Sequence, residues 1–182
     1  MAHTRIMSEE IDRALVGKLF GASIASESHE NSNMAKDQPS VCLRLWHPHC
    51  SPEDVNRGVG LVPQITHAIG DQRMTPIGRL LTGKYTEMFW MHRTEMRNGE
   101  DVANGIGRVL DLIGPHHVFF RDFLASGGRG ELFVGVFLDG CLVLTIPQDQ
   151  LRQIAELGLN LSFDIYPPER RTEGDAQEIL PA

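Results

Sequence analysis

Two imidazoles and a thiol lie within residues 47–50, where the sequence reads His-Pro-His-Cys. These are ligand types that zinc and related metals take in proteins. The other candidates, His92, His116 and His117, lack ligand spacing, so no second cluster completes a metal site. Cys50 would need a partner base to act as a nucleophile, and the spacing identifies none. We therefore expect no metal and no catalytic residue here, and we interpret the stretch as a loop between a strand and a helix.

Basic residues gather in one part of an otherwise acidic chain. The 182 residues include 17 Lys and Arg against 24 Asp and Glu, a formal net charge of −7, whereas residues 73–97 hold five cations and two acids. Arginine binds carboxylate or phosphate through two parallel hydrogen bonds, and tryptophan can stack on a flat group or anchor an interface. The alternative is a solvated loop beside two core tryptophans. The predicted binding surface comprises Arg73, Arg79, Lys84, Trp46 and Trp90.

Composition narrows the class of protein. With 41% hydrophobic and 23% charged residues, the chain is typical of a soluble globular protein with one core. Its negative charge disfavours binding to nucleic acid or to an anionic membrane. No stretch approaches the roughly 18 apolar residues of a spanning helix, and the first residues lack an export signal, so we expect a cytosolic protein. The glycines form no phosphate loop, and we expect no cofactor.

Residues 132–138 are almost continuously apolar, which is typical of a central strand. The Asp139-Gly140 pair then predicts a two-residue type I′ turn, so residues 141–146 should return antiparallel beside that strand. Thr145 and Gln148 are spaced as a capping box for a short helix. Residues 159–166 alternate apolar and polar side chains, which predicts a last strand that buries one face.

The preceding part of the chain alternates strand and helix patterns. Ser51 can cap a helix that carries a proline at its first position and acids in its first turn. A long loop is predicted at residues 70–83, which are poor in core-forming side chains. The longest helix should be interrupted at Gly114-Pro115. The predicted elements are a strand at 41–46, a short helix from Pro52 that ends near Gly58 or Gly60, a strand at 85–92, a helix that starts after Asn98 or Gly99 and carries Val102, Ile106, Val109 and Ile113, and a helical stretch at 119–124.

Both ends of the chain look separate from this core. A short helix is predicted at residues 8–20, with Ile11, Leu15 and Leu19 on one side, followed by a flexible linker. We predict an N-terminal extension at 1–40, a single globular domain at 41–168 and a disordered tail at 169–182. Both ends should be dispensable for folding. The short helix at 8–20 is the part to which this prediction applies least, because it could cover exposed sheet.

The order of these elements predicts an α+β fold, a mainly antiparallel sheet with helices packed on one face. Two segments, SPEDVNRGVGLVP and PQDQLRQIAELGLNL, are loosely alike and favour a pseudo-duplicated unit. The combination of LRLWHP, a capped SPEDV helix, ELFVGVF and IAELGLNLSFDIYPP resembles the bacterial domain-of-unknown-function 4279 family over residues 41–168. The resemblance implies the fold, and it carries over no catalytic residue.

For function, we expect a noncatalytic binding or interaction protein, conceivably an immunity-type inhibitor of a toxin. The expected partner is an acidic protein or a small anionic ligand that the basic, aromatic-bearing region recognises. The alternative is an enzyme or sensor for a small anionic ligand that uses the same residues.

Overall fold

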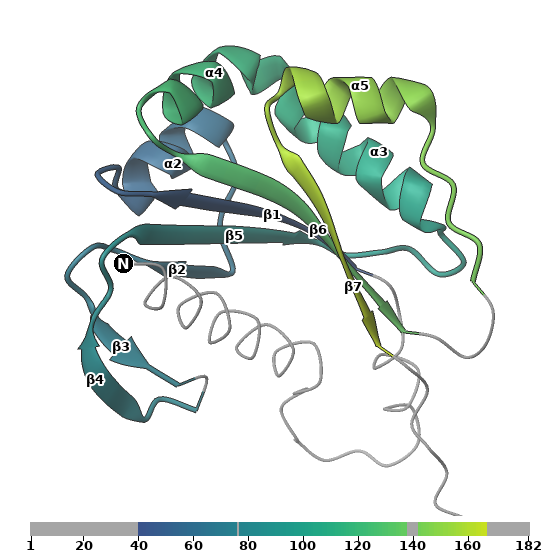
Figure 1. The fold of residues 1–182 in the computed structure, drawn as a ribbon. Helices are drawn as coiled ribbons and strands as arrows, with labels where there is room; N and C mark the ends of the chain where they lie inside the picture. The colour runs from purple at the N-terminus through teal and green to yellow at the C-terminus, as the bar shows by residue number, and fades with distance from the viewer. Residues whose placement is uncertain (1–39, 76, 138–141, 167–182) are drawn as a thin grey trace, which may run out of the picture.

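A five-stranded sheet forms the centre of the protein (Figure 1). The computed structural model describes residues 40–75, 77–137 and 142–166. Neighbouring strands pair antiparallel except at one edge, where β6 and β7 are parallel. The sheet is therefore mainly antiparallel, as predicted. In spatial order its strands are β2 (Ile65–His67), β5 (Met88–Thr94), β1 (Ser40–His47), β6 (Arg129–Phe137) and β7 (Asn160–Tyr166).

The helices of the described residues lie on one face of this sheet (Figure 1), which confirms the predicted α+β layering. Ser51 caps the first of them, and its Oγ and the Asp54 carboxylate form a reciprocal capping box. Asp101 caps the longest helix by accepting the backbone N–H of Asn104 at 2.7 Å. The helices are α2 (Pro52–Val59), α3 (Val102–Ile113), the 3₁₀ helix η1 (Gly114–His116), α4 (His117–Ala125) and α5 (Gln148–Glu156).

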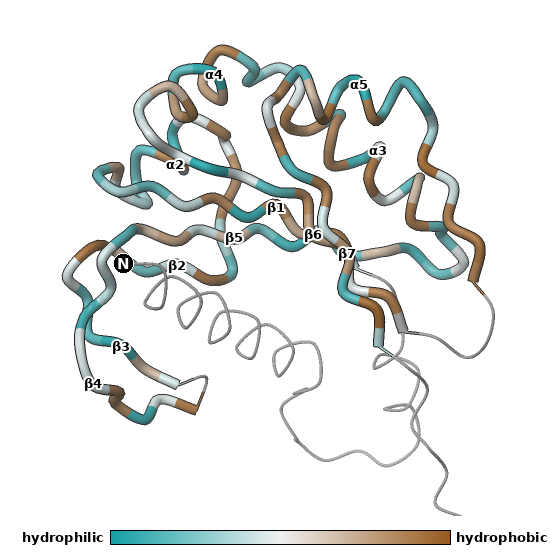
Figure 2. Tube along the Cα trace, in the orientation of Figure 1, coloured by the Kyte–Doolittle hydropathy of each residue, from teal (hydrophilic) through white to brown (hydrophobic). Residues whose placement is uncertain are grey.

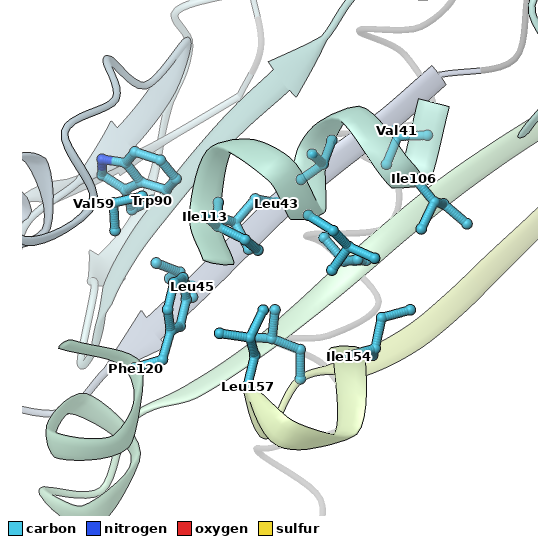
Figure 3. Close-up of a cluster of buried hydrophobic side chains, with 14 of the residues drawn as sticks. Val41, Leu43, Leu45, Val59, Trp90, Ile106, Ile113, Phe120, Ile154 and Leu157 are labelled. Carbon is cyan, nitrogen blue, oxygen red and sulfur yellow. The ribbon is translucent and has the colours of Figure 1, made fainter. Parts of the chain in front are cut away.

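The main core lies between the helices and the sheet (Figure 3). Alternation in β1 sends Val41, Leu43 and Leu45 toward the helices, where Ile106 of α3 and Phe120 of α4 meet them. All five side chains are buried. Full burial of such a side chain stabilises the fold by about 1.5–3 kcal/mol, so this layer dominates stability. None of the helices in the described part of the chain has the length and hydrophobicity to cross a lipid bilayer.

The predicted hairpin after β6 is wrong. Residues 142–147 form no strand, and both edges of β6 are already paired, with β1 and with β7. The chain instead crosses over through α5 and returns as a parallel strand, which a crossover helix permits and a tight turn does not. The predicted turn at Asp139-Gly140 lies outside the described residues. The predicted capping box is also wrong, because Pro147 is the N-cap of α5 and no side chain caps it.

Other boundaries differ from the prediction. Residues 70–83, predicted as a loop, contain a two-stranded sheet of β3 (Gln72–Met74) and β4 (Leu80–Lys84). The following strand begins at Met88 rather than at Tyr85, because Tyr85 exchanges backbone hydrogen bonds with Gly70 and Asp71 at the base of that small sheet. The short strand β2 was missed. The suggested internal repeat stays a prediction.

Candidate functional site

The predicted basic residues lie on a two-stranded arm that stands apart from the main sheet (Figure 1). We define the arm as residues 70–75 and 77–84. Arg79 and Lys84 are exposed on it, and Arg73 is half-buried. The Gln72 side chain holds the two strands together by donating to the carbonyls of Leu81 and Gly83. The structure thus brings the three predicted cations onto one hairpin.

The arm also carries large apolar residues that are exposed, and brown stretches of its trace mark such residues in Figure 2. Met74 and Leu80 are directly paired across the strands and therefore share one face of the hairpin. Leu80 is 67% exposed, and Ile77 in the connecting turn is 89% exposed. Neither belongs to either hydrophobic core cluster. The arm therefore offers apolar and cationic groups together to solvent.

The two predicted tryptophans do not join this surface. Leu45 is paired with Trp90 and Trp46 with Phe89, so antiparallel pairing puts the two indoles on opposite faces of the sheet. The Trp90 ring is 0% exposed, and its Nε1–H donates to Asn56 Oδ1 of α2 at 2.7 Å. Trp46 is buried on the face away from the helices. In this arrangement neither ring can stack against a ligand beside Arg73 and Arg79.

The His47–Cys50 stretch lines a groove of about 520 Å³ beside α4. His47 Nδ1 accepts the backbone N–H groups of His49 and Cys50 at 2.9 and 2.8 Å. An atom that accepts two hydrogen bonds carries no proton, so the proton sits on Nε2, which lies 3.1 Å from Ser126 Oγ. Burial, with His49 as a lesser cause, lowers the pKa of His47. The imidazole is therefore neutral and both its nitrogens are engaged.

Cys50 is not prepared as a nucleophile. Its Sγ donates to the Ser51 carbonyl at 3.5 Å, and burial followed by the nearby Asp54 raises the pKa of the thiol. A reactive cysteine needs the opposite shift, toward the thiolate. Among the described residues, no group of three or more His, Cys, Asp or Glu side chains is arranged to hold a metal ion. The groove can therefore admit a small group without providing acid–base or nucleophilic chemistry.

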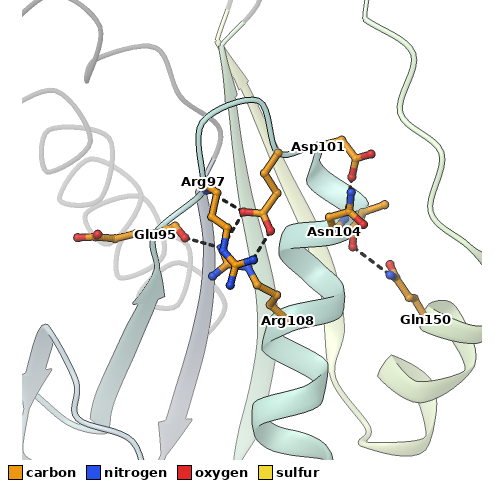
Figure 4. Close-up of polar contacts among 8 residues, drawn as sticks. Glu95, Arg97, Asp101, Asn104, Arg108 and Gln150 are labelled. Carbon is orange, nitrogen blue, oxygen red and sulfur yellow. Dashed lines mark hydrogen bonds and ion pairs between the residues drawn. The ribbon is translucent and has the colours of Figure 1, made fainter.

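A second hollow, of about 480 Å³, lies at the start of α3. Arg108 donates to both carboxylate oxygens of Glu100 at 2.7 Å, and Glu100 also accepts the backbone N–H of Arg97 (Figure 4). That backbone hydrogen bond, with Arg108 as a lesser cause, lowers the pKa of Glu100. The charge of the Arg108 guanidinium is thus already balanced by Glu100. This ion pair holds the loop before α3 in place. Sequence reasoning missed it, because eight positions separate the two residues and span a loop and a helix start.

Comparison with known proteins gives one result. No curated protein and no solved structure matches the chain. The family described as a domain of unknown function (DUF4279) matches residues 37–168, well over half of the chain. This range contains both the helix-covered sheet and the arm. The chain therefore belongs to the DUF4279 family.

Proposed function

We propose that the protein is a noncatalytic binding protein of the bacterial cytosol that recognises an acidic protein partner with the arm. The observation that carries this proposal is the combination on one hairpin of three cations with exposed Met74, Leu80 and Ile77. Exposed apolar groups rimmed by polar ones are typical of interaction sites. An immunity-type inhibitor, whose partner is a toxin, is the form of binding protein that we propose.

Charge favours an acidic partner. The arm holds Arg73, Arg79 and Lys84 against a single acid, Asp71, whose carboxylate accepts the backbone N–H of Ala68 at 2.7 Å. The whole chain carries −7, so the arm is a locally positive site on an acidic protein. Such a site would guide an acidic surface into register and repel other faces of that partner. Binding should weaken as salt is added.

The apolar groups would supply the affinity. A side chain the size of Leu or Ile gains about 1.5–3 kcal/mol when it becomes fully buried. Ile77 and Leu80 are 89% and 67% exposed, so most of this gain is still available to them when an interface buries them. The paired Met74 adds an adaptable contact, since methionine fills irregular gaps. A noncatalytic role is also supported by His47, whose two ring nitrogens are both engaged, and by Cys50, whose thiol has a raised pKa.

The test compares the double variant Arg73→Ala/Arg79→Ala with Arg121→Ala/Arg152→Ala, which removes two exposed arginines from α4 and α5. Tagged proteins, confirmed folded by circular dichroism, are used to capture partners from a lysate of the source cells. A captured protein is then purified and titrated by calorimetry at two salt concentrations. A true hot spot costs about 2 kcal/mol, so we expect the arm variant to bind roughly 30-fold more weakly and the control to bind normally.

Stability serves as the internal check. Arg79 is exposed, and Arg73 is half-buried but belongs to an arm outside both core clusters. Surface substitutions away from a core change the free energy of unfolding by no more than about 0.5 kcal/mol per site, so the arm variant should melt like the parent protein. Identical capture by both variants would refute the arm as a recognition surface. Inorganic phosphate tests the alternative of a small anionic ligand: if it raises the melting temperature of the parent but not of the arm variant, a ligand sensor is favoured instead.

A further inference from the structure

A second apolar cluster lies on the face of the sheet away from the helices, which we call the open face. Its members all come from strands, and they are only 0–7% exposed. Alternation explains their position, because they occupy the strand positions between those that face the main core. The cluster consists of Cys42, Trp46, Phe89, Met91 and Phe133, with Ile65 packed partly against it.

The described side chains that lie over or beside this cluster include long ones from the sheet's own strands. The Arg44 guanidinium lies 3.3 Å from the centre of the Phe133 ring, and the Arg129 guanidinium lies 4.2 Å from the centre of the Trp46 ring. Every described helix is drawn on the other side of the sheet (Figure 1). Cys42, the third residue of the central strand, is nevertheless 0% exposed. The near-complete burial of Trp46, Phe89, Met91 and Phe133 on a face that no described helix covers points to a further layer over the open face.

We propose that residues 8–20 supply this layer, as an amphipathic helix whose Ile11, Leu15 and Leu19 pack on the open face around Cys42. The sequence pattern provides the matching stripe, since these residues recur every four positions and a helix brings such positions onto one side. The proposal does not depend on the proposed binding function of the arm.

Dimensions fit this arrangement. A 13-residue helix is about 20 Å long. Five strands at about 4.8 Å spacing make a sheet about 19 Å wide, so one such helix can cross its face. The linker of residues 21–39 can extend to about 60 Å, and it joins the sheet at Ser40, the first residue of the central strand β1. The segment therefore has both the length and the reach to lie over Cys42.

Other segments outside the described residues fit less well. Residues 167–182 have only Ile179 and Leu180 as large aliphatic side chains, among prolines and charges. Residues 138–141 are too few to form a layer. If a second copy of the chain covered the open face, the exposure of Cys42 would depend on protein concentration, and the experiment can detect this dependence.

The test uses the reactivity of one thiol in the full-length chain. Cys50→Ser and Cys141→Ser leave Cys42 as the single cysteine of three. Burial raises the pKa of Cys42 to about 11, so little of its thiol is ionised at pH 8. A covered Cys42 should therefore react slowly with an aromatic disulfide reagent at that pH. Leu15→Glu is then compared with Ala14→Glu, which puts the same charge one position away, about 100° around a helix.

We expect Leu15→Glu to raise the labelling rate of Cys42 at least tenfold and Ala14→Glu to leave it unchanged. If Leu15→Glu alone prevents folding, as judged by circular dichroism, the segment is part of the core and the proposal also stands. Equal labelling rates in the parent and both folded variants would overturn it. A rate that falls with protein concentration and ignores both substitutions would assign the cover to a second copy, and would overturn it as well.

Discussion

Removal of the hydrogen bond between Trp90 and Asn56 should measure how much one buried polar contact stabilises the fold. Asn56→Ala leaves the Trp90 Nε1–H without its acceptor, in a ring that is 0% exposed. A buried donor that loses its partner costs about 1–3 kcal/mol. The same substitution also improves helix propensity by up to about 0.7 kcal/mol. The two effects oppose each other, so the single variant alone would underestimate the bond.

Asn104→Ala corrects for this gain. Asn104 is an exposed residue in the first turn of α3, and the Asp101 cap uses its backbone N–H rather than its side chain. Because the propensity term is shared, the difference between the two variants isolates the lost hydrogen bond. We expect Asn56→Ala to be less stable than Asn104→Ala by about 1–3 kcal/mol in urea titration followed by fluorescence. Equal midpoints for the two variants would refute the assignment of Trp90 as a structural anchor.

Three further predictions concern the core and its dependence on pH. Gly128→Ala should destabilise the fold by about 1–3 kcal/mol, because the added Cβ would lie 2.6 Å from the backbone oxygen of Phe123. Gly114→Ala, where the added Cβ meets no other atom, should be neutral or stabilising, and thermal melts of both variants check the contrast. Val136→Asp places an unpaired charge in the buried sheet and should cost at least about 3 kcal/mol, so a soluble variant with an unchanged melting temperature would contradict the architecture. Burial lowers the pKa of His67 from 6.5 to about 4, so the unfolded chain binds more protons between these values and stability should fall as pH drops from about 6.5 to 4. His67→Phe should flatten that part of the stability profile, and melting temperatures at pH 7 and pH 5 for both proteins test this.

Local signals in the sequence predicted much of the helix layer. Ser51, the proline after it and the acids of the first turn predicted an N-cap, and the structure forms this cap, with Asp54 completing a capping box. Gly114-Pro115 likewise marked the break between α3 and α4. These features could be predicted because the groups that interact are close together in the chain. The family resemblance and the fold class followed from the same motifs and are confirmed.

Long-range pairing could not be predicted in the same way. The apolar run after β6 suggested a hairpin partner, but residues 142–147 leave the sheet and Val143 is exposed. The choice between a hairpin and a crossover depends on whether another strand already occupies the edge of β6, which no local pattern encodes. The register between strands could not be predicted either, because alternation shows which residues share a face within one strand but not how two strands align. Only the pairing of β1 with β5 puts Trp46 and Trp90 on opposite faces.

The position of the arm explains why recognition and stability should separate in this protein. No arm residue belongs to either hydrophobic cluster, and the arm strands pair with each other rather than with the main sheet. A two-stranded ribbon is only marginally stable alone, and this one is joined at its base through the backbone of Tyr85. Substitutions of exposed arm side chains therefore remove few contacts that hold the domain together. A loss of binding in the Arg73/Arg79 variant can accordingly be interpreted as loss of recognition, whereas the same loss after substitution of Trp90 could not.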